Sequence, residues 1–149
     1  MDFPNPRTLH EIGEVLREAE WRVQSMTGKP GWSASKTYKG KATTVLVVVG
    51  APMKGLVLFR TVFGFPCPPD HRDALVQLMN DINGAWPIMG FYLDGDVACY
   101  RTHVIREEDG SLSKRLLLQT CAAVLEIVTQ QRERLEVVAA TGKRPPPSD

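Results

Sequence analysis

Residues 32–63 read WSASKTYKGKATTVLVVVGAPMKGLVLFRTVF, and this stretch decides the fold. Its middle, residues 43–49, is almost entirely β-branched, which favours a strand because branched side chains pack well on a pleated backbone. A looser alternation over residues 32–38 and a second apolar segment over residues 56–63 predict one more strand on each side. Only short glycine-containing turns separate the three segments, and parallel crossovers need longer connections. An antiparallel meander of three strands is therefore predicted.

An amphipathic helix is predicted before these strands, over residues 8–26. Its apolar side chains recur at intervals of three and four, which is the spacing of one helical face. Either Thr8 or Asn5 can cap its N-terminus, since both side chains accept hydrogen bonds from exposed backbone amides. The glycine- and proline-rich turn that starts at Thr27 is expected to end it.

A second helix and a hairpin are predicted after the meander. The helix covers residues 74–82 and is expected to end at Asn83 and Gly84, because both residue types tolerate a left-handed backbone. Strands over residues 89–93 and 97–104 follow. Asp94 and Gly95 between them are typical of a two-residue hairpin turn.

The last predicted helix begins at Ser111 or Ser113, either of which can cap it, and runs to about Val138. Its apolar residues span an arc of roughly 200°, whereas a surface helix usually needs a stripe somewhat wider than 100°. This excess indicates burial on two sides, one against its own sheet and one against a second surface. The residues that form the arc are Leu116, Leu117, Leu118, Cys121, Val124, Leu125, Ile127 and Val128.

The bulk composition indicates one cytoplasmic domain. A chain of 149 residues suits a single core, expected over residues 1–140, and the proline-rich residues 141–149 are expected to form a disordered tail. The formal net charge is +1, from 18 Lys and Arg against 17 Asp and Glu, which disfavours nucleic-acid and membrane partners. No signal peptide is visible, and no apolar run approaches the ~18 residues of a membrane span.

The three cysteines are expected to be reduced thiols without a catalytic role. They are Cys67, Cys99 and Cys121, and no C-x-x-C pair exists, so zinc and redox motifs are not indicated. Cys99 and Cys121 lie in apolar patterns and are expected to pack as small hydrophobic residues. Cys67 stands between two prolines and is expected to be the exposed thiol.

No pattern in the chain predicts a catalytic, metal or cofactor site. His10, His71 and His103 lie on different elements and lack the paired spacing of metal ligands. Residues 50–55 lack the Gly-Lys-Ser/Thr ending of a phosphate loop and are not followed by a helix. Nothing pairs a nucleophile with a base, so the chain is expected not to be an enzyme and to need no cofactor.

Excess apolar surface predicts a homodimer. The strands over residues 43–49 and 56–63 are apolar on both alternations, so one face can meet the helices. The other face must meet a second copy, a partner, or a covering segment of the same chain. The sequence does not divide the candidate surface between a dimer interface and a client groove. The candidate residues are Trp32, Tyr38, Val45, Val47, Leu56, Leu58, Leu117, Val124 and Val128.

The second half of the chain reads MNDINGAW over residues 79–86 and GFYLDGDVACYRTHVIRE over residues 90–107. The N-x-x-N spacing of Asn80 and Asn83, an acidic-glycine hairpin and a long C-terminal helix resemble the YbjN family. More distantly, this order of elements is similar to the type III secretion chaperones. The resemblance covers residues 9–138.

The resemblance implies an α+β fold: a helix, three antiparallel strands, a helix, two or more strands and a long C-terminal helix, as in type III secretion chaperones. It also implies a homodimer without enzymatic activity that binds a segment of an unidentified client protein, in a stress response. The alternative is a nucleic-acid-associated regulator. Its basis is an interleaved set of lysines and aromatic residues: Lys29, Lys36, Lys39 and Lys41 with Trp32 and Tyr38.

Overall fold

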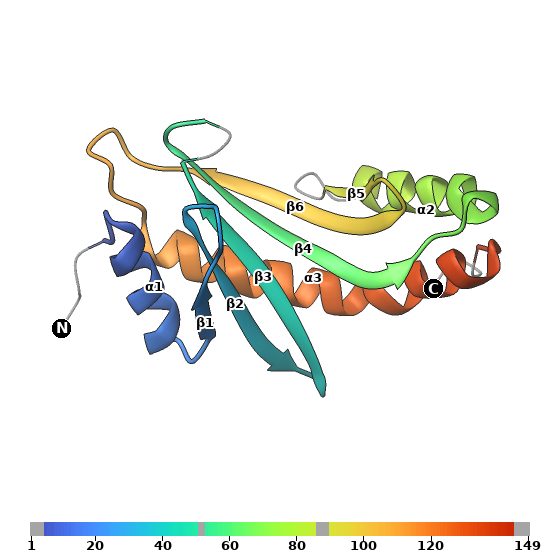
Figure 1. Cartoon of the computed structure of the whole chain (residues 1–149), viewed down its shortest axis with the longest axis horizontal. Helices are drawn as coiled ribbons and strands as arrows, with labels where there is room; N and C mark the ends of the chain where they lie inside the picture. Colours follow the sequence, from blue (N-terminus) through green and yellow to red (C-terminus); the bar gives the residue numbers. More distant parts are fainter. Residues whose placement is uncertain (1–4, 51–52, 86–89, 145–149) are drawn as a thin grey trace. The chain divides into compact units, whose positions relative to one another are not determined.

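The computed structural model describes residues 5–50, 53–85 and 90–144. Within them, six strands form one sheet in the order β1-β2-β3-β4-β6-β5 (Figure 1). The predicted α+β class and its order of elements are confirmed. The elements are α1 (Leu9–Glu18), β1 (Arg22–Ser25), β2 (Gly31–Tyr38), β3 (Lys41–Val49), β4 (Leu56–Pro66), the 3₁₀ helix η1 (Pro69–His71), α2 (Arg72–Ala85), β5 (Phe91–Asp94), β6 (Val97–Ile105) and α3 (Lys114–Thr141).

The chain groups into two compact units. The first unit contains the residues up to Arg60 together with His103–Ile127, and the second contains Thr61–Thr102 together with the residues from Val128. Strands β4 and β6 and helix α3 pass from one unit into the other.

Helix α1 of the first unit begins at a reciprocal cap. The Thr8 hydroxyl accepts a hydrogen bond from the Glu11 amide at 3.1 Å, and the Glu11 carboxylate accepts one from the Thr8 amide at 3.2 Å. This capping box satisfies two backbone donors at the helix N-terminus. The Thr8 bonds also lower the pKa of the Glu11 carboxyl. Of the two predicted caps, Thr8 is therefore correct, and Asn5 instead accepts from the Lys114 amide at the start of α3.

The predicted helix over residues 8–26 is wrong in its second half. Helix α1 ends at Glu18, Glu20 takes a left-handed φ of 69°, and β1 follows from Arg22. Strand β1 pairs with β2 in antiparallel register, from Arg22 opposite Ser35 to Ser25 opposite Trp32. Pairing with a neighbouring strand outweighed the local helical spacing of this segment.

The predicted meander is confirmed as β2, β3 and β4. Lys39 and Gly40 form its first turn with φ of 51° and 78°, the left-handed pair that a tight two-residue hairpin requires. The strand register fixes which residues share a face: Ala34 lies opposite Val45, and Val47 lies opposite Phe59. This buried side is called the inner face, and the side that carries the alternate residues is called the outer face.

Helix α3 starts at Ser113, whose hydroxyl accepts from the Leu116 amide at 3.1 Å. Ser111, the other predicted cap, instead donates to Asp109. In the first unit the helix buries a single stripe, and Leu116 on its margin is 39% exposed. The eight predicted arc residues therefore do not all bury. The stripe consists of Leu117, Cys121, Val124 and Leu125.

In the second unit, α3 stays apolar on one side beyond Glu133 and ends at Thr141, three residues later than predicted. Leu135, Val138 and Ala139 are buried there. The Ala139 carbonyl contacts His71 Nδ1 at 2.8 Å, and Arg144 pairs with Asp81 of α2. Of the predicted tail, residues 145–149 lie outside the described part of the chain.

The hairpin of β5 and β6 and the helix before it also belong to the second unit. The hairpin is confirmed, but its two turn residues are Gly95 and Asp96 and not Asp94 and Gly95 as predicted, because Asp94 pairs with Val97; Gly95 takes a left-handed φ of 64° there. In the core, the ring of Phe63 stacks on that of Phe91 with centroids 6.2 Å apart, and the Tyr100 ring meets the Phe91 ring edge to face at 4.9 Å. Helix α2 does not end at Asn83 and Gly84 as predicted but continues to Ala85.

Asn83 instead uses its amide side chain to hold strand β5. Its Nδ2 donates to the Phe91 carbonyl and its Oδ1 accepts from the Phe91 amide, both at 2.9 Å. The side chain thus satisfies both backbone groups of Phe91, as a neighbouring strand would. This gives a physical role to the second asparagine of the N-x-x-N spacing.

Replacing this amide is expected to destabilise the chain. Asn83→Ala removes two hydrogen bonds and leaves part-buried backbone groups unpaired, so we expect a loss of about 1–3 kcal/mol in the free energy of unfolding. The matched control is Asn80→Ala, one turn earlier on the exposed side of the same helix. Urea unfolding followed by circular dichroism measures both, and equal losses would contradict the assigned role.

Candidate functional site

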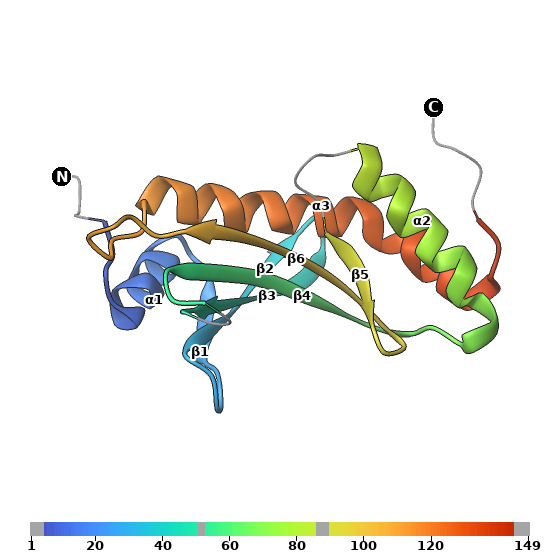
Figure 2. The same ribbon diagram turned by 90° about the horizontal axis from the view of Figure 1, so that it is seen from above.

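The inner face of the first unit is closed by the chain's own helices. Trp32 donates from Nε1 to the Leu9 carbonyl at 2.7 Å, and the Arg17 guanidinium lies 5.1 Å from its ring centroid. Gly13 allows this approach, because a Cβ there would lie 2.6 Å from the indole. The first half of α3 passes behind β2 and β3 in Figure 1 and runs along one side of them in Figure 2.

Lys36 belongs to this closed side and not to the surface. Its ammonium donates to the Ala19 carbonyl at 2.9 Å and stands 5.2 Å from the Trp21 ring centroid. A cation at the C-terminal end of a helix is stabilised by the helix dipole. Lys36 therefore helps to end α1, which removes it from the predicted set of surface lysines.

The structure divides the nine predicted surface residues among three places. Trp32 and Tyr38 are half-buried on the inner face, and Leu56 and Leu58 are half-buried on the outer face. The remaining five are buried in the chain's own core, so they are not exposed to a partner as predicted: strand register turns two of them inward, and the other three lie on α3 itself. These are Val45, Val47, Leu117, Val124 and Val128, each at most 1% exposed.

Most side chains on the outer face of the first unit are uncharged and of two kinds, although Arg22 of β1 and Arg60 of β4 also lie on this face. Hydroxyl groups occupy the part on β2 and the start of β3, where Ser35 and Thr44 share a hydrogen bond of 2.8 Å. Apolar side chains occupy the part on β3, β4 and the end of β6. We call this second group the outer apolar patch, and it consists of Leu46, Leu56, Leu58 and Ile105.

The strand register brings the members of the patch together. Leu58 lies opposite Val48, a buried residue of the same face, and Leu46 lies two residues from Val48 along β3, opposite Arg60. The Arg106 amide donates to the Gly55 carbonyl at 2.8 Å, which places Ile105 beside Leu56. Ile105 is 71% exposed, which is unusual for a large apolar residue at the end of a strand.

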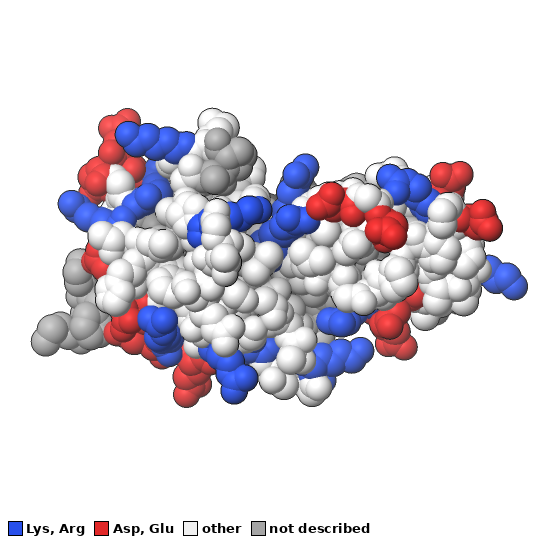
Figure 3. All heavy atoms as spheres, in the orientation of Figure 1, with Lys and Arg blue, Asp and Glu red and all other residues white. Residues whose placement is uncertain are grey.

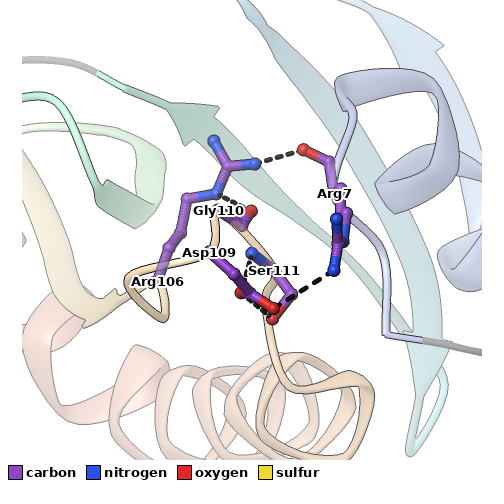
Figure 4. A network of polar contacts seen from close by, with 5 residues as sticks. All are labelled: Arg7, Arg106, Asp109, Gly110 and Ser111. Atoms are coloured by element: carbon purple, nitrogen blue, oxygen red, sulfur yellow. Dashed lines mark hydrogen bonds and ion pairs between the residues drawn. The ribbon is translucent and has the colours of Figure 1, made fainter.

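The loop between β6 and α3 is tied to the N-terminal segment by polar groups (Figure 4). Arg106 donates to the carbonyls of Gly110 and Arg7, and the Arg7 guanidinium pairs with Asp109 at 3.2 Å. Hydrogen bonds from the hydroxyl and amide of Ser111 lower the pKa of the Asp109 carboxyl. These groups are engaged with one another, so the network positions the loop that leads into α3.

A sequence model of the YbjN family, described as "Putative bacterial sensory transduction regulator", matches residues 8–136. The chain belongs to the YbjN family. The match spans every described element from α1 to most of α3. No curated protein matches the chain.

The cysteines of this YbjN-family chain are all free and buried. Cys67 is 4% exposed, so the prediction of an exposed thiol is wrong: its backbone amide bonds the Asp96 carbonyl and holds it inward. Burial raises the pKa of the Cys67 thiol. The charge of Arg72 lowers this pKa, and the charge of Asp96 raises it further. The predicted packing of Cys99 and Cys121 as buried residues is confirmed.

Within the described ranges of this YbjN-family chain, no group of three or more His, Cys, Asp or Glu is placed to hold a metal ion. The same part of the chain contains no helix both long and apolar enough to span a membrane. The outer apolar patch of the first unit presents Ile105, 71% exposed, beside three half-buried leucines. The predictions missed Ile105, although the alternation of residues 101–105 ends on it.

Proposed function

We propose that this YbjN-family chain is a non-enzymatic regulatory protein that binds a segment of another protein on the outer face of its sheet. The observation that supports this function is the outer apolar patch, with Ile105 71% exposed at its margin. Burying such a patch against a partner is favourable by about 25 cal/mol per Å² of apolar surface. A family described as regulatory fits a chain that acts through a bound partner.

The homodimer and the chaperone-like role in a stress response belong to the same proposal. Light scattering on the purified chain at micromolar concentration measures the oligomeric state, and a strictly monomeric result would remove the dimer. Binding of a client segment does not depend on that result, because the outer apolar patch lies within one copy.

Peptide selection tests the proposed surface. A random peptide library is selected on the wild-type protein, and each enriched peptide is then measured on the double variant Leu58→Ser with Ile105→Ser. We expect at least a tenfold loss of affinity, since about 1.4 kcal/mol of lost apolar contact gives a tenfold change. The control is Val137→Ser, which removes a 43% exposed apolar side chain from the second unit.

The double variant is expected to fold, because both side chains are partly exposed. Circular dichroism checks that it does. Peptides that bind the double variant as tightly as the wild type would exclude the outer apolar patch as the binding surface.

A further inference from the structure

The first four strands carry charge of only one sign. Between Glu20 and Asp70 the chain contains seven of its 18 Lys and Arg and none of its 17 Asp and Glu. The near-neutral total therefore conceals a strongly basic meander. Such a local excess sets the sign of the partner that the meander attracts.

Four of these seven basic residues are exposed at the margins of the outer face, and a fifth, Arg60, is half-buried on that face opposite Leu46. Lys39 stands at the hairpin of β2 and β3, and Arg22 lies on the edge strand β1. Lys29 and Lys54 occupy the turns at the opposite ends of the strands. Lys41 pairs with Tyr38 and lies on the inner-face side with it. We call Arg22, Lys29, Lys39 and Lys54 the basic rim. Figure 3 shows a broad uncharged area over β2 and β3, with Lys and Arg side chains at its margins and Asp and Glu side chains among them on its left and lower sides.

We propose that the segment bound on the outer face is an acidic amphipathic helix of a partner protein. This inference rests on the proposed function and names its partner. A helix packed on this sheet face would cover the outer apolar patch with its apolar stripe. The carboxylates on either side of the stripe would then stand within reach of the basic rim. Complementary charge of this kind contributes mainly to association rate and specificity.

A second copy of the chain fits this face less well. A twofold axis through the face would bring each copy's exposed cations toward the same cations of the other copy. No acidic residue of the meander is available to offset that repulsion. Self-association through the outer face is therefore disfavoured, and a dimer would use another surface.

A nucleic acid also fits less well. Single strands are held by aromatic side chains on which bases stack. The outer-face residues of the described strands β1 to β3 and of the first part of β4 include no aromatic residue. Trp32 and Tyr38, on which the nucleic-acid prediction depended, lie on the inner face, and Lys36 is engaged with α1.

Three matched peptides test the inference on the full chain. The first is a designed helix with a leucine stripe and glutamate elsewhere, the second replaces every glutamate with lysine, and the third keeps glutamate but replaces leucine with serine. Fluorescence anisotropy at low and physiological salt measures their affinities. We expect the first to bind at least about tenfold more tightly than either twin and to weaken as salt rises.

Charge variants locate the effect. The triple variant Lys29→Gln, Lys39→Gln and Lys54→Gln is expected to weaken the affinity for the acidic helix by about tenfold while leaving the fold intact, because these side chains are exposed. The matched control removes three cations from elsewhere: Arg115→Gln, Arg132→Gln and Lys143→Gln. Equal losses in the two triple variants would overturn the assignment to the basic rim.

The outcomes separate this inference from the proposed function. If the acidic and basic helices bind equally and both lose affinity in the Leu58→Ser, Ile105→Ser variant, the charge preference is overturned. The outer apolar patch is then still supported as the binding surface. If neither helix binds but selected peptides still require the patch, the acidic helix is again overturned. Single-stranded DNA or anionic vesicles could instead bind more tightly than the acidic helix and lose affinity in the Lys→Gln triple variant. That result would overturn the acidic helix as the partner in favour of that ligand.

Discussion

Phe59→Ala is expected to lower the free energy of unfolding by about 3–5 kcal/mol. Phe59 is fully buried on the inner face of β4, directly opposite Val47, which is also fully buried. Removing its ring loses apolar burial and leaves a cavity, because a paired strand on one side and packed helices on the other cannot close completely. For a chain of this length, each kcal/mol lowers the melting temperature by about 2–4 °C.

Urea unfolding followed by circular dichroism measures this loss, and Ile105→Ala is the matched control. Ile105 is also a large apolar strand residue of the first unit but is 71% exposed, so its truncation should change stability by less than about 0.5 kcal/mol. A Phe59→Ala loss below about 1 kcal/mol would contradict the assignment of the inner face to the core.

The strands of the meander could be predicted because their signals are local. The β-branched run of β3 has no good helical alternative. The tight turns at Lys39–Gly40 and at Gly95 need left-handed backbone, which glycine supplies within the turn itself. Elements that are specified by their own residues are visible in the sequence alone.

The boundary between α1 and β1 could not be predicted in the same way. Val23 and Met26 continue the helical spacing of the preceding residues by coincidence. Val23 lies in β1, whose strand conformation depends on β2, which comes later in the chain and offers a ladder of hydrogen bonds; Met26 follows the end of that strand. Glu20 takes a left-handed backbone conformation after the helix, but glutamate is not a residue type that signals the end of a helix. Non-local pairing decided this segment, and no local pattern carries that information.

Only part of the candidate site could be predicted from the sequence, because its composition also depends on strand pairing. Both alternations of β3 and β4 are apolar, so the sequence indicates that two faces exist but not which residues share one. The register settles this by placing Val47 opposite Phe59 and Val48 opposite Leu58. Two residues of the predicted surface, Leu56 and Leu58, thereby fall on the open side, while Val45 and Val47 fall inside.

Cys121 is expected to resist alkylation in the folded chain by at least about a hundredfold relative to an ordinary thiol. Its side chain is fully buried, and burial raises its pKa to about 12 despite the nearby Lys36. At pH 8 the fraction of reactive thiolate is then roughly a thousandfold below that of a thiol with the ordinary pKa of 9.0. The thiolate is the nucleophile, so the rate falls with this fraction.

The measurement is labelling with iodoacetamide at pH 8, followed by mass spectrometry of the Cys121 peptide in a Cys67→Ser, Cys99→Ser variant. The same variant unfolded in urea is the control, and it should react at the rate of a free thiol. Because the thiol stays protonated until the pH approaches 12, raising the pH from 7 to 9 should increase native labelling without making it fast. Native labelling as rapid as in urea would mean that the stripe of α3 opens readily, since a closed stripe leaves this sulfur no access to the reagent.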